Sequence, residues 1–236
     1  ELLEWLETNT FPEEAKYDEA DYAWKAYGVF AENMRKSAAT RDCIVGTIHR
    51  EATRLLMDMM EKTGLDTMIG KVNMDRNCPD YIIEETEESA GETLEWIKDV
   101  LHRKYKNTHP ILTPRFTPSC TDELMEELKK LQMRYGLPLQ SHLSENQGEI
   151  AWVKELCPWA EFYGDAYDRF GLFGADCPTV MAHCVYSGDQ EIARMKENGV
   201  FIANCPASNM HVPSGIGPVP LFLWQGRSGC TAMGGA

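Results

Sequence analysis

The sequence predicts an α/β fold of the (β/α)8 TIM-type barrel class, present here in incomplete form. Short apolar, β-rich segments alternate with helical patterns, which is typical of a parallel sheet with crossover helices. No glycine-rich phosphate loop accompanies them, which favours a barrel over a doubly wound nucleotide fold. Seven strands can be counted where about eight would close a barrel. We therefore expect residues 1–236 to form one incomplete barrel domain.

The predicted strands share an apolar centre and are bounded by turn residues. They are 40–49, 67–74, 109–116, 137–142, 179–183, 199–204 and, more weakly, 226–230. Four segments between them carry apolar residues at helical spacing. These predicted helices are 51–63, 84–105, 122–135 and 189–198, and the last of them ends before Gly199. The first 30 residues are polar and aromatic, begin at Glu1 rather than at a methionine, and have no predicted element.

The charge balance restricts the class of partner. Lys and Arg total 23 against 37 Asp and Glu, a formal net charge of -14. Such a chain does not attract a phosphate backbone or an anionic membrane surface. We therefore expect a small-molecule substrate and neither a nucleic-acid nor a membrane partner.

The cysteines and the hydropathy pattern predict a cytoplasmic protein. The eight cysteines are scattered singly, without a CxxC pair or the density of a disulfide scaffold, and are expected to be reduced. No apolar run approaches the roughly 20 residues that span a bilayer, and no basic-then-apolar segment opens the chain.

In a (β/α) barrel the active site lies at the carboxyl ends of the strands, so the last polar residue of each strand is informative. These residues are His49, Asp75, Arg115, His142, His183 and Asn204. A single histidine at a strand end is usually a satisfied core or surface residue. His142 and His183, however, end consecutive predicted strands, and two neutral imidazoles converging at one point are typical of a metal site. Two ligands are still too few for a catalytic zinc, which normally takes three protein ligands and a water.

Glu145 follows His142 by three residues and can lie above a metal that the histidine holds. A metal lowers the pKa of its water, and a nearby carboxylate can take that proton and pass it to the substrate. The alternative interpretation is structural: Ser144 would be a helix N-cap and Glu145 a first-turn acid favoured by the helix dipole.

Arg115 and Phe116 together can hold a planar, hydrogen-bonding ligand by fork geometry and stacking. An ion pair between Arg115 and one of the many acids is the alternative. Asn204 and the "NCPASN" turn could line the same mouth, although these are ordinary turn residues. Cys184 and Cys205 adjoin this region without a paired histidine, so a thiol nucleophile is not expected.

Several stretches together resemble the guanine deaminases, zinc-dependent members of the amidohydrolase superfamily. They are "GKVNMD", "TEESAGETLEWI", "PILTPRFTPSCTDELMEEL", "LPLQSHLSEN", "VMAHCVYS" and "NCPASN", with "TFPEE" near the start, and they span most of residues 1 to 210. The resemblance implies a cytoplasmic homodimeric enzyme of purine catabolism. Its reaction is the hydrolytic deamination of guanine to xanthine and ammonia by a metal-activated water.

The resemblance also implies roles for the residues singled out above. His142 and His183 would be two ligands of one zinc per chain, with iron as a possible substitute. Glu145 would be the proton shuttle, and Arg115 with Phe116 would position the purine.

The chain departs from the family's pattern at both ends of the expected barrel. The family's first strand carries a His-x-His pair followed by a base-binding glutamine, and this chain contains no such motif. The family also has an aspartate just after the last strand, where Thr231 or Ala232 stands in "GCTAMGG". Up to three metal ligands are therefore absent, and the first strand and the end of the last are missing or altered. The chain is expected to be a partial one.

Two other interpretations of the same residues remain open. The protein could be another aminohydrolase of this superfamily, acting on a different purine, pyrimidine or triazine amine. It could also be a truncated barrel, inactive for lack of metal ligands, that serves only as a binding or oligomer-forming module.

Overall fold

The computed structural model describes residues 2–211, 214–215 and 229–231. The chain opens with a run of helical segments for which the sequence predicted no element. They are α1 (Leu2–Trp5), the π-helical turn η1 (Leu6–Thr10), α2 (Phe11–Ala15), the 3₁₀ turn η2 (Lys16–Asp18) and α3 (Ala20–Lys36). The buried residues Ala23, Tyr27 and Ala31 recur at every fourth position of α3 and hold it against the rest of the protein.

The strands of the described residues all pair in parallel. They are β1 (Arg41–Val45), β2 (Asp66–Gly70), β3 (Val72–Asn73), β4 (Thr108–Pro110), β5 (Thr113–Pro114), β6 (Leu139–Leu143), β7 (Thr179–His183), β8 (Phe201–Asn204) and β9 (Gly229–Thr231). The pairings are β1-β2-β4, β3-β5 and β6-β7-β8-β9. A parallel bridge between Leu112 and Leu139 links the β4–β5 region to β6. The pairing follows chain order if β2 with β3, and β4 with β5, are each counted as one interrupted strand, because β2 pairs with β4 and β3 with β5.

The prediction of alternating parallel strands and helices is confirmed, with one difference in count. The predicted strands 67–74 and 109–116 are each divided in two, as β2 with β3 and as β4 with β5. Of the weakly predicted strand 226–230, only Gly229 and Cys230 lie within the described residues, as part of β9. The described strands form an open arrangement and not a closed barrel, because β1 pairs with β2 alone and β9 with β8 alone among them.

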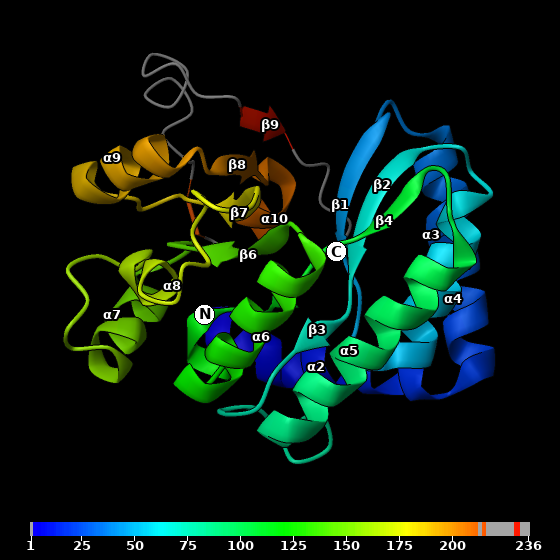
Figure 1. The fold of residues 1–236 in the computed structure, drawn as a ribbon, viewed down its shortest axis with the longest axis horizontal. Coiled ribbons are helices and arrows are strands. Elements are labelled where there is room, and N and C mark those ends of the chain that lie inside the picture. The colour runs from blue at the N-terminus through cyan, green and yellow to red at the C-terminus, as the bar shows by residue number, and fades with distance from the viewer. Residues whose placement is uncertain (1, 212–213, 216–228, 232–236) are drawn as a thin grey trace.

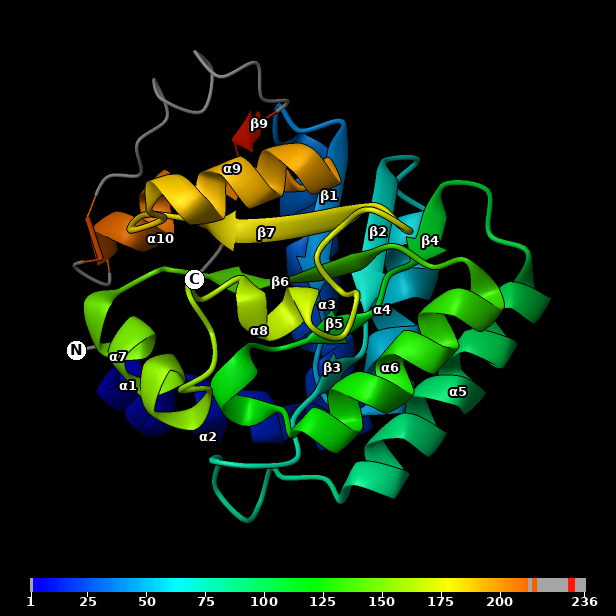
Figure 2. The same cartoon turned by 60° about the vertical axis from the view of Figure 1, so that its left-hand side comes forward.

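Helices follow most strands and cover the outside of the sheets. They are α4 (Arg50–Glu61), α5 (Thr86–Arg103), η3 (Thr117–Ser119), α6 (Asp122–Tyr135), α7 (Gln147–Leu156), α8 (Asp165–Asp168), α9 (Asp189–Asn198) and α10 (Pro206–His211). Figure 1 shows α4 and α5 beside β2 and β4, and Figure 2 shows α9 over β7, with α1 near α7 on the opposite side. The predicted helices 122–135 and 189–198 coincide with α6 and α9, and the other two agree to within about two residues at each end.

Local sequence explains why α6 has these ends. Thr121 is its N-cap and accepts a hydrogen bond from the backbone N–H of Leu124 at 3.1 Å. Gly136 ends the helix in the left-handed conformation, with φ of 62°, which glycine adopts without a Cβ penalty. Leu124 and Leu128 between these ends are fully buried in the main core.

The core has two parts. The main cluster runs between the sheets and the helices that cover them and includes Leu56, Trp96, Leu128, Leu139 and Met181. A smaller apolar cluster consists of Phe11, Ile48, Val72, Met74 and Ile82. This small cluster places α2 against residues just after β1 and around β3. Among the described residues, no helix combines the length and the apolar character that crossing a membrane requires.

Candidate functional site

The two predicted histidine ligands lie side by side at the carboxyl ends of β6 and β7. The strands pair in parallel, with His142 opposite Ala182 and Leu143 opposite His183. The imidazole rings of His142 and His183 stack with centroids 5.4 Å apart and planes 21° from parallel. The prediction that these side chains meet is therefore confirmed, whereas their role as ligands stays a prediction.

The hydrogen bonds of the two rings fix which nitrogen carries the proton. His142 Nδ1 lies 2.7 Å from the backbone oxygen of Arg115, and His183 Nδ1 lies 2.7 Å from Oδ1 of Asn209 in α10. Both oxygens only accept, so each Nδ1 must be the donor. Each Nε2 then keeps its lone pair, which is the arrangement that partners of a metal-ligating histidine produce.

The protein keeps both imidazoles neutral. Desolvation lowers the pKa of His142 to about 3, and the neighbouring His183 and the Arg115 guanidinium act in the same direction. Burial likewise lowers the pKa of His183 below its ordinary value. Neutral imidazole is the form that binds a metal.

Glu145 lies beside His183, and its role as proton shuttle stays a prediction. Its carboxylate Oε1 lies 3.4 Å from His183 Nδ1, and only 6% of the residue is exposed. Burial raises the pKa of Glu145 to about 7, although the Ser214 hydroxyl opposes the shift. A carboxyl group with this pKa can both take up and release a proton near neutral pH.

The turn that carries Glu145 has a strained backbone held by buried acids. Ser144 has φ of 47°, in the left-handed region that non-glycine residues rarely adopt. Its hydroxyl donates to Glu191 at 2.8 Å, and the backbone N–H of Glu145 donates to Glu149 at 2.9 Å. The alternative role of Ser144 as N-cap of the next helix is wrong. The N-cap of α7 is Asn146, whose side chain accepts from the backbone N–H of Glu149.

Arg115 follows β5 and is buried in an ion pair. Its Nη1 lies 2.5 Å from Oε2 of Glu14 in α2 and 3.7 Å from the sulfur of Met74. The Phe11 ring packs against the guanidinium, 5.0 Å from the ring centroid to Cζ. The structure thus contains the ion pair that the sequence left as the alternative for Arg115. The Arg115 backbone also joins the histidine pair, because its oxygen accepts from His142.

Phe116 is buried next to Arg115 and lies edge-on to Trp152 of α7, with ring centroids 6.3 Å apart. Tyr167 fastens this region to β6. Its hydroxyl donates to the backbone oxygen of His142 at 3.0 Å and accepts from the backbone N–H of Thr117 at 3.1 Å. Arg115, Phe116 and His142 therefore occupy fixed positions relative to one another.

Other residues at strand ends have structural partners. Asp75 accepts hydrogen bonds from Thr86 and from the backbone and side chain of Thr121, so it anchors the starts of α5 and α6. His49 is the N-cap residue of α4, and its Nδ1 lies 3.6 Å from Oδ1 of Asp18. Burial raises the pKa of the Cys184 thiol well above its ordinary value, in agreement with the expectation that it is not a nucleophile.

Sequence reasoning missed Glu14, Asn209, Glu149 and Glu191. Asn209 is the last residue of the quoted "NCPASN" stretch, so the stretch gave a signal for it. Glu14 is likewise the last residue of "TFPEE", but nothing in the sequence indicated its pairing with Arg115, which is 101 residues away.

The donor atoms fit part of a metal site. The two Nε2 lone pairs are suitable ligands, but within the described residues no group of three or more His, Cys, Asp or Glu side chains is placed to hold a metal ion. Thr231, one of the two predicted positions of the family's aspartate, ends β9, and Ala232 lies outside the described residues.

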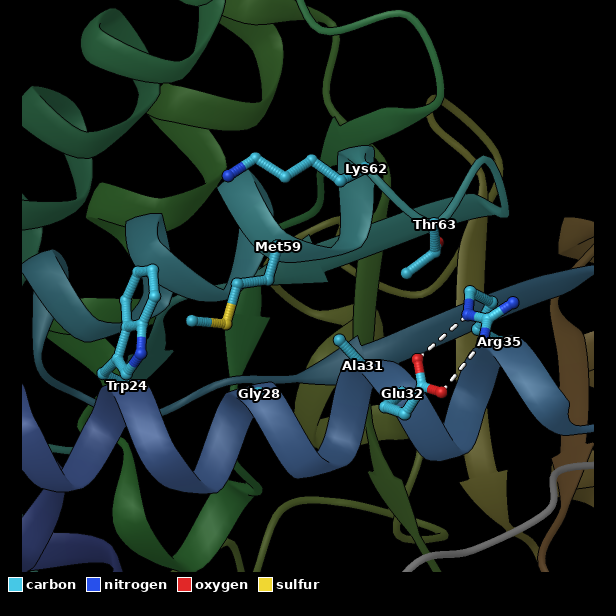
Figure 3. A pocket seen from close by; sticks show the side chains of 8 residues that line it. All are labelled: Trp24, Gly28, Ala31, Glu32, Arg35, Met59, Lys62 and Thr63. Atoms are coloured by element: carbon cyan, nitrogen blue, oxygen red, sulfur yellow. Dashed lines mark hydrogen bonds and ion pairs between the residues drawn. The ribbon is translucent and has the colours of Figure 1, made fainter.

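A groove of about 350 Å³ lies elsewhere, on the outer side of α3 and α4. Figure 3 shows Trp24 and Ala31 of α3 facing Met59 and Lys62 of the α4 region, with an ion pair between Glu32 and Arg35 at the rim. None of the predicted site residues lines this groove, so it is separate from the histidine pair.

Comparisons with known proteins identify the relatives of this chain. The model of the "Amidohydrolase family" matches residues 1–226. The guanine deaminase of Dictyostelium discoideum is 43% identical over 214 residues, which are 91% of this chain and 47% of that protein. The chain therefore spans about half the length of the curated relatives it matches.

Solved structures give the same picture. A guanine deaminase from C. acetobutylicum with bound guanine superimposes with a TM-score of 0.94 at 46% identity, over 98% of this chain and 55% of that one. An adenosine deaminase from Xanthomonas campestris with bound zinc has a TM-score of 0.81 at 19% identity, over 99% of this chain and 51% of that one. At that identity, the second likeness shows the fold alone.

Proposed function

The chain belongs to the amidohydrolase family, and from this membership we propose that the protein hydrolyses guanine to xanthine and ammonia. The observation that carries the proposal is the grouping of His142, His183 and Glu145 at the ends of two adjacent parallel strands. The 46% identity to a guanine deaminase structure with bound guanine supports guanine as the substrate. We further propose that residues 1–236 are part of a (β/α)8 barrel domain.

His142 and His183 would hold a zinc ion through their Nε2 atoms, because both Nδ1 atoms are engaged as donors. Zinc in such a site acidifies a water and polarises the carbon that is attacked. The neutral state of both rings suits this role, since neither has to lose a proton before it binds the metal.

Glu145 would move the proton that the reaction requires. With a pKa near 7, its carboxylate can accept a proton from the attacking water and return it to the departing amine. The Ser144 hydroxyl donates to Glu191 and the Glu145 backbone N–H donates to Glu149, so the turn that carries the Glu145 side chain is held in place.

Arg115 and Phe116 would position the purine. The guanidinium is a planar donor that matches a carbonyl oxygen and an adjacent ring nitrogen, and the aromatic ring supplies apolar contact area. Both residues are buried, which favours a rigid binding surface over an adaptable one.

The test measures ammonia and xanthine released from guanine by the purified, zinc-loaded protein, with adenine, cytosine and melamine as competing amines. We expect release from guanine, and we expect Arg115→Ala to reduce kcat/KM for guanine far more than it reduces zinc content. Loaded protein that ignores guanine but deaminates another amine would overturn the substrate assignment. Unchanged guanine kinetics in Arg115→Ala would overturn the role of Arg115.

A further inference from the structure

Glu14 is a buried carboxylate whose two oxygens have different surroundings. Oε2 accepts from Nη1 of Arg115 at 2.5 Å, whereas Oε1 is buried without a hydrogen-bond partner among the described residues. Only 8% of Glu14 is exposed. An unpaired buried acceptor is costly, so its presence in a folded protein requires an explanation.

The neighbours of Glu14 do not satisfy Oε1. Phe11 and Met74 belong to the small apolar cluster, and both contact the Arg115 guanidinium. The missing donor must therefore come from outside this cluster. Glu14 also adjoins the candidate site, because the backbone of its partner Arg115 accepts the hydrogen bond from His142.

Together the two side chains present a donor next to an acceptor. Within the described residues, the Arg115 guanidinium donates through Nη1 only. Its other N–H donors are therefore left for a ligand. Glu14 Oε1 offers an acceptor alongside them. A cyclic amide, or lactam, shows the complementary pattern, since its carbonyl oxygen accepts next to an N–H that donates.

We propose that Glu14 is a specificity-determining residue that accepts a hydrogen bond from the lactam N–H of a 6-oxopurine, while Arg115 donates to the adjacent carbonyl. This inference rests on the proposed function, because it names the residue that reads the substrate's lactam edge. A carboxylate suits the position because both of its oxygens accept, one from Arg115 and one from the ligand. A 6-aminopurine reverses the pattern of the edge and leaves Oε1 unpaired.

The experiment measures binding and not turnover. Hypoxanthine carries the lactam edge but has no exocyclic amine to lose, and unsubstituted purine lacks both the carbonyl and the lactam N–H. Their dissociation constants are measured by calorimetry for the wild-type protein and for Glu14→Gln, whose side chain has the same shape but only one acceptor oxygen. The control is Glu13→Gln, the exposed neighbour on α2, whose side chain is 53% exposed.

We expect Glu14→Gln to weaken hypoxanthine binding about 10- to 100-fold, the usual effect of losing a hydrogen bond to a charged group. Purine binding should change less than about twofold, and Glu13→Gln should match the wild type for both probes. Equal losses for both probes would mean that Glu14 only supports the packing of α2, and unchanged hypoxanthine binding would mean that Oε1 has no lactam partner. Either result overturns the inference.

A second measurement needs no variant. In the wild-type complex with ¹⁵N-labelled hypoxanthine, the N1 proton should be shifted downfield and protected from solvent exchange, as in a bond to a carboxylate. An unshifted, rapidly exchanging proton overturns the inference. Its failure is distinguishable from failure of the proposed function. If the protein binds hypoxanthine selectively but releases no ammonia from guanine, only the deaminase assignment is wrong. If it releases ammonia from guanine and Glu14→Gln binds hypoxanthine as the wild type does, only the lactam contact is wrong.

Discussion

At the scale of single residues, the two imidazole rings owe their orientation to acceptors on other elements. His142 donates to the backbone after β5, and His183 donates to Asn209 in α10. The Asn209 side chain acts only through His183 in this arrangement, because its own Nδ2 is buried without a partner in the described part of the chain. The position of α10 therefore controls the direction of one proposed metal ligand.

Removing the acceptor of His183 should loosen the metal. We expect Asn209→Ala to weaken zinc affinity about 10- to 100-fold, since partners of ligating histidines typically contribute this much. Zinc affinity is measured by competition with a chelator of known strength. Ser208→Ala, one residue away on α10, serves as the control and should leave the affinity unchanged. An Asn209→Ala protein that keeps wild-type affinity would show that the ring needs no such partner.

Replacing Glu145, the proposed proton carrier, should affect turnover and not metal binding. We expect Glu145→Gln to lower kcat for guanine by about 10²- to 10⁴-fold, the usual contribution of general acid–base catalysis. The amide keeps the size of the side chain but cannot accept and release a proton. Steady-state kinetics and metal analysis are run on the same preparation. Loss of zinc in parallel with kcat would assign Glu145 to metal binding instead.

The residues of this group differ in how far the sequence could predict them. His142, His183 and Glu145 stand at or just after strand ends, so the alternation of strands and helices was sufficient to bring them together. The role of Arg115 was ambiguous, because the residues around it do not show whether its guanidinium binds a ligand or pairs with an acidic side chain. Its partner Glu14 could not be predicted, since only the folded chain brings α2 to the end of β5.

At the scale of elements, the turn between β6 and α7 contains one buried acid, Glu145, and contacts two more, Glu149 of α7 and Glu191 of α9. Glu145, Glu149 and Glu191 all have pKa values raised by burial. Glu149 lies in the first turn of α7, where its carboxylate accepts from the Glu145 backbone and from the Tyr163 hydroxyl. The turn thus gains a fixed geometry at the cost of keeping acids out of water.

This cost should appear as a pH dependence of stability. Burial raises the pKa of Glu149 from 4.5 to about 7, so folding favours its protonated form. The contribution of Glu149 to the free energy of unfolding is fully present below about pH 4.5. It falls by on the order of 3 kcal/mol as the pH rises through 7. The free energy of unfolding, measured with denaturant from pH 5 to 8, should therefore decline less in Glu149→Gln than in the wild type. Glu155→Gln, at an exposed position on α7, should keep the wild-type slope, and a wild-type slope in Glu149→Gln would refute the assignment.

Elements with signals at both ends were predicted best. The helix α6 has an N-cap threonine, an apolar face and a closing glycine, and α9 likewise ends at Gly199 with φ of 70°. The first helices lack such signals. In α3, the side chains of Trp24 and Val29 are exposed although apolar, so the buried stripe of Ala23, Tyr27 and Ala31 is hard to distinguish before the fold is known. Tertiary packing defines these helices more than local propensity does.

At the scale of the whole molecule, the described strands leave two edges. Among them, β1 has β2 as its only neighbour and β9 has only β8. Open edges present unpaired backbone groups that can join another chain. Chain-order pairing of parallel strands could be predicted from the alternation of elements, whereas closure depends on pairings beyond the described residues.

The edge at β1 should make the isolated 236-residue chain self-associate. Sedimentation velocity should show species that grow with protein concentration, and Val45→Lys, at the exposed end of β1, should reduce this growth because charge on an edge opposes pairing. Val29→Lys, at a 63% exposed position on α3, is the matched control and should not reduce it. A monomer that unfolds cooperatively at all concentrations would contradict the prediction.

The pairing of each strand with its neighbour in the chain also has a consequence during synthesis. Because every strand's partner is next or nearly next to emerge from the ribosome, the sheets can assemble as the chain grows. Glu14 is an exception, since Arg115 follows it by 101 residues. At 5 to 20 residues per second, α2 waits roughly 5 to 20 seconds for that partner. During this interval the Glu14 carboxylate lacks its partner, so the ion pair forms only after about half of the 236 residues have been made.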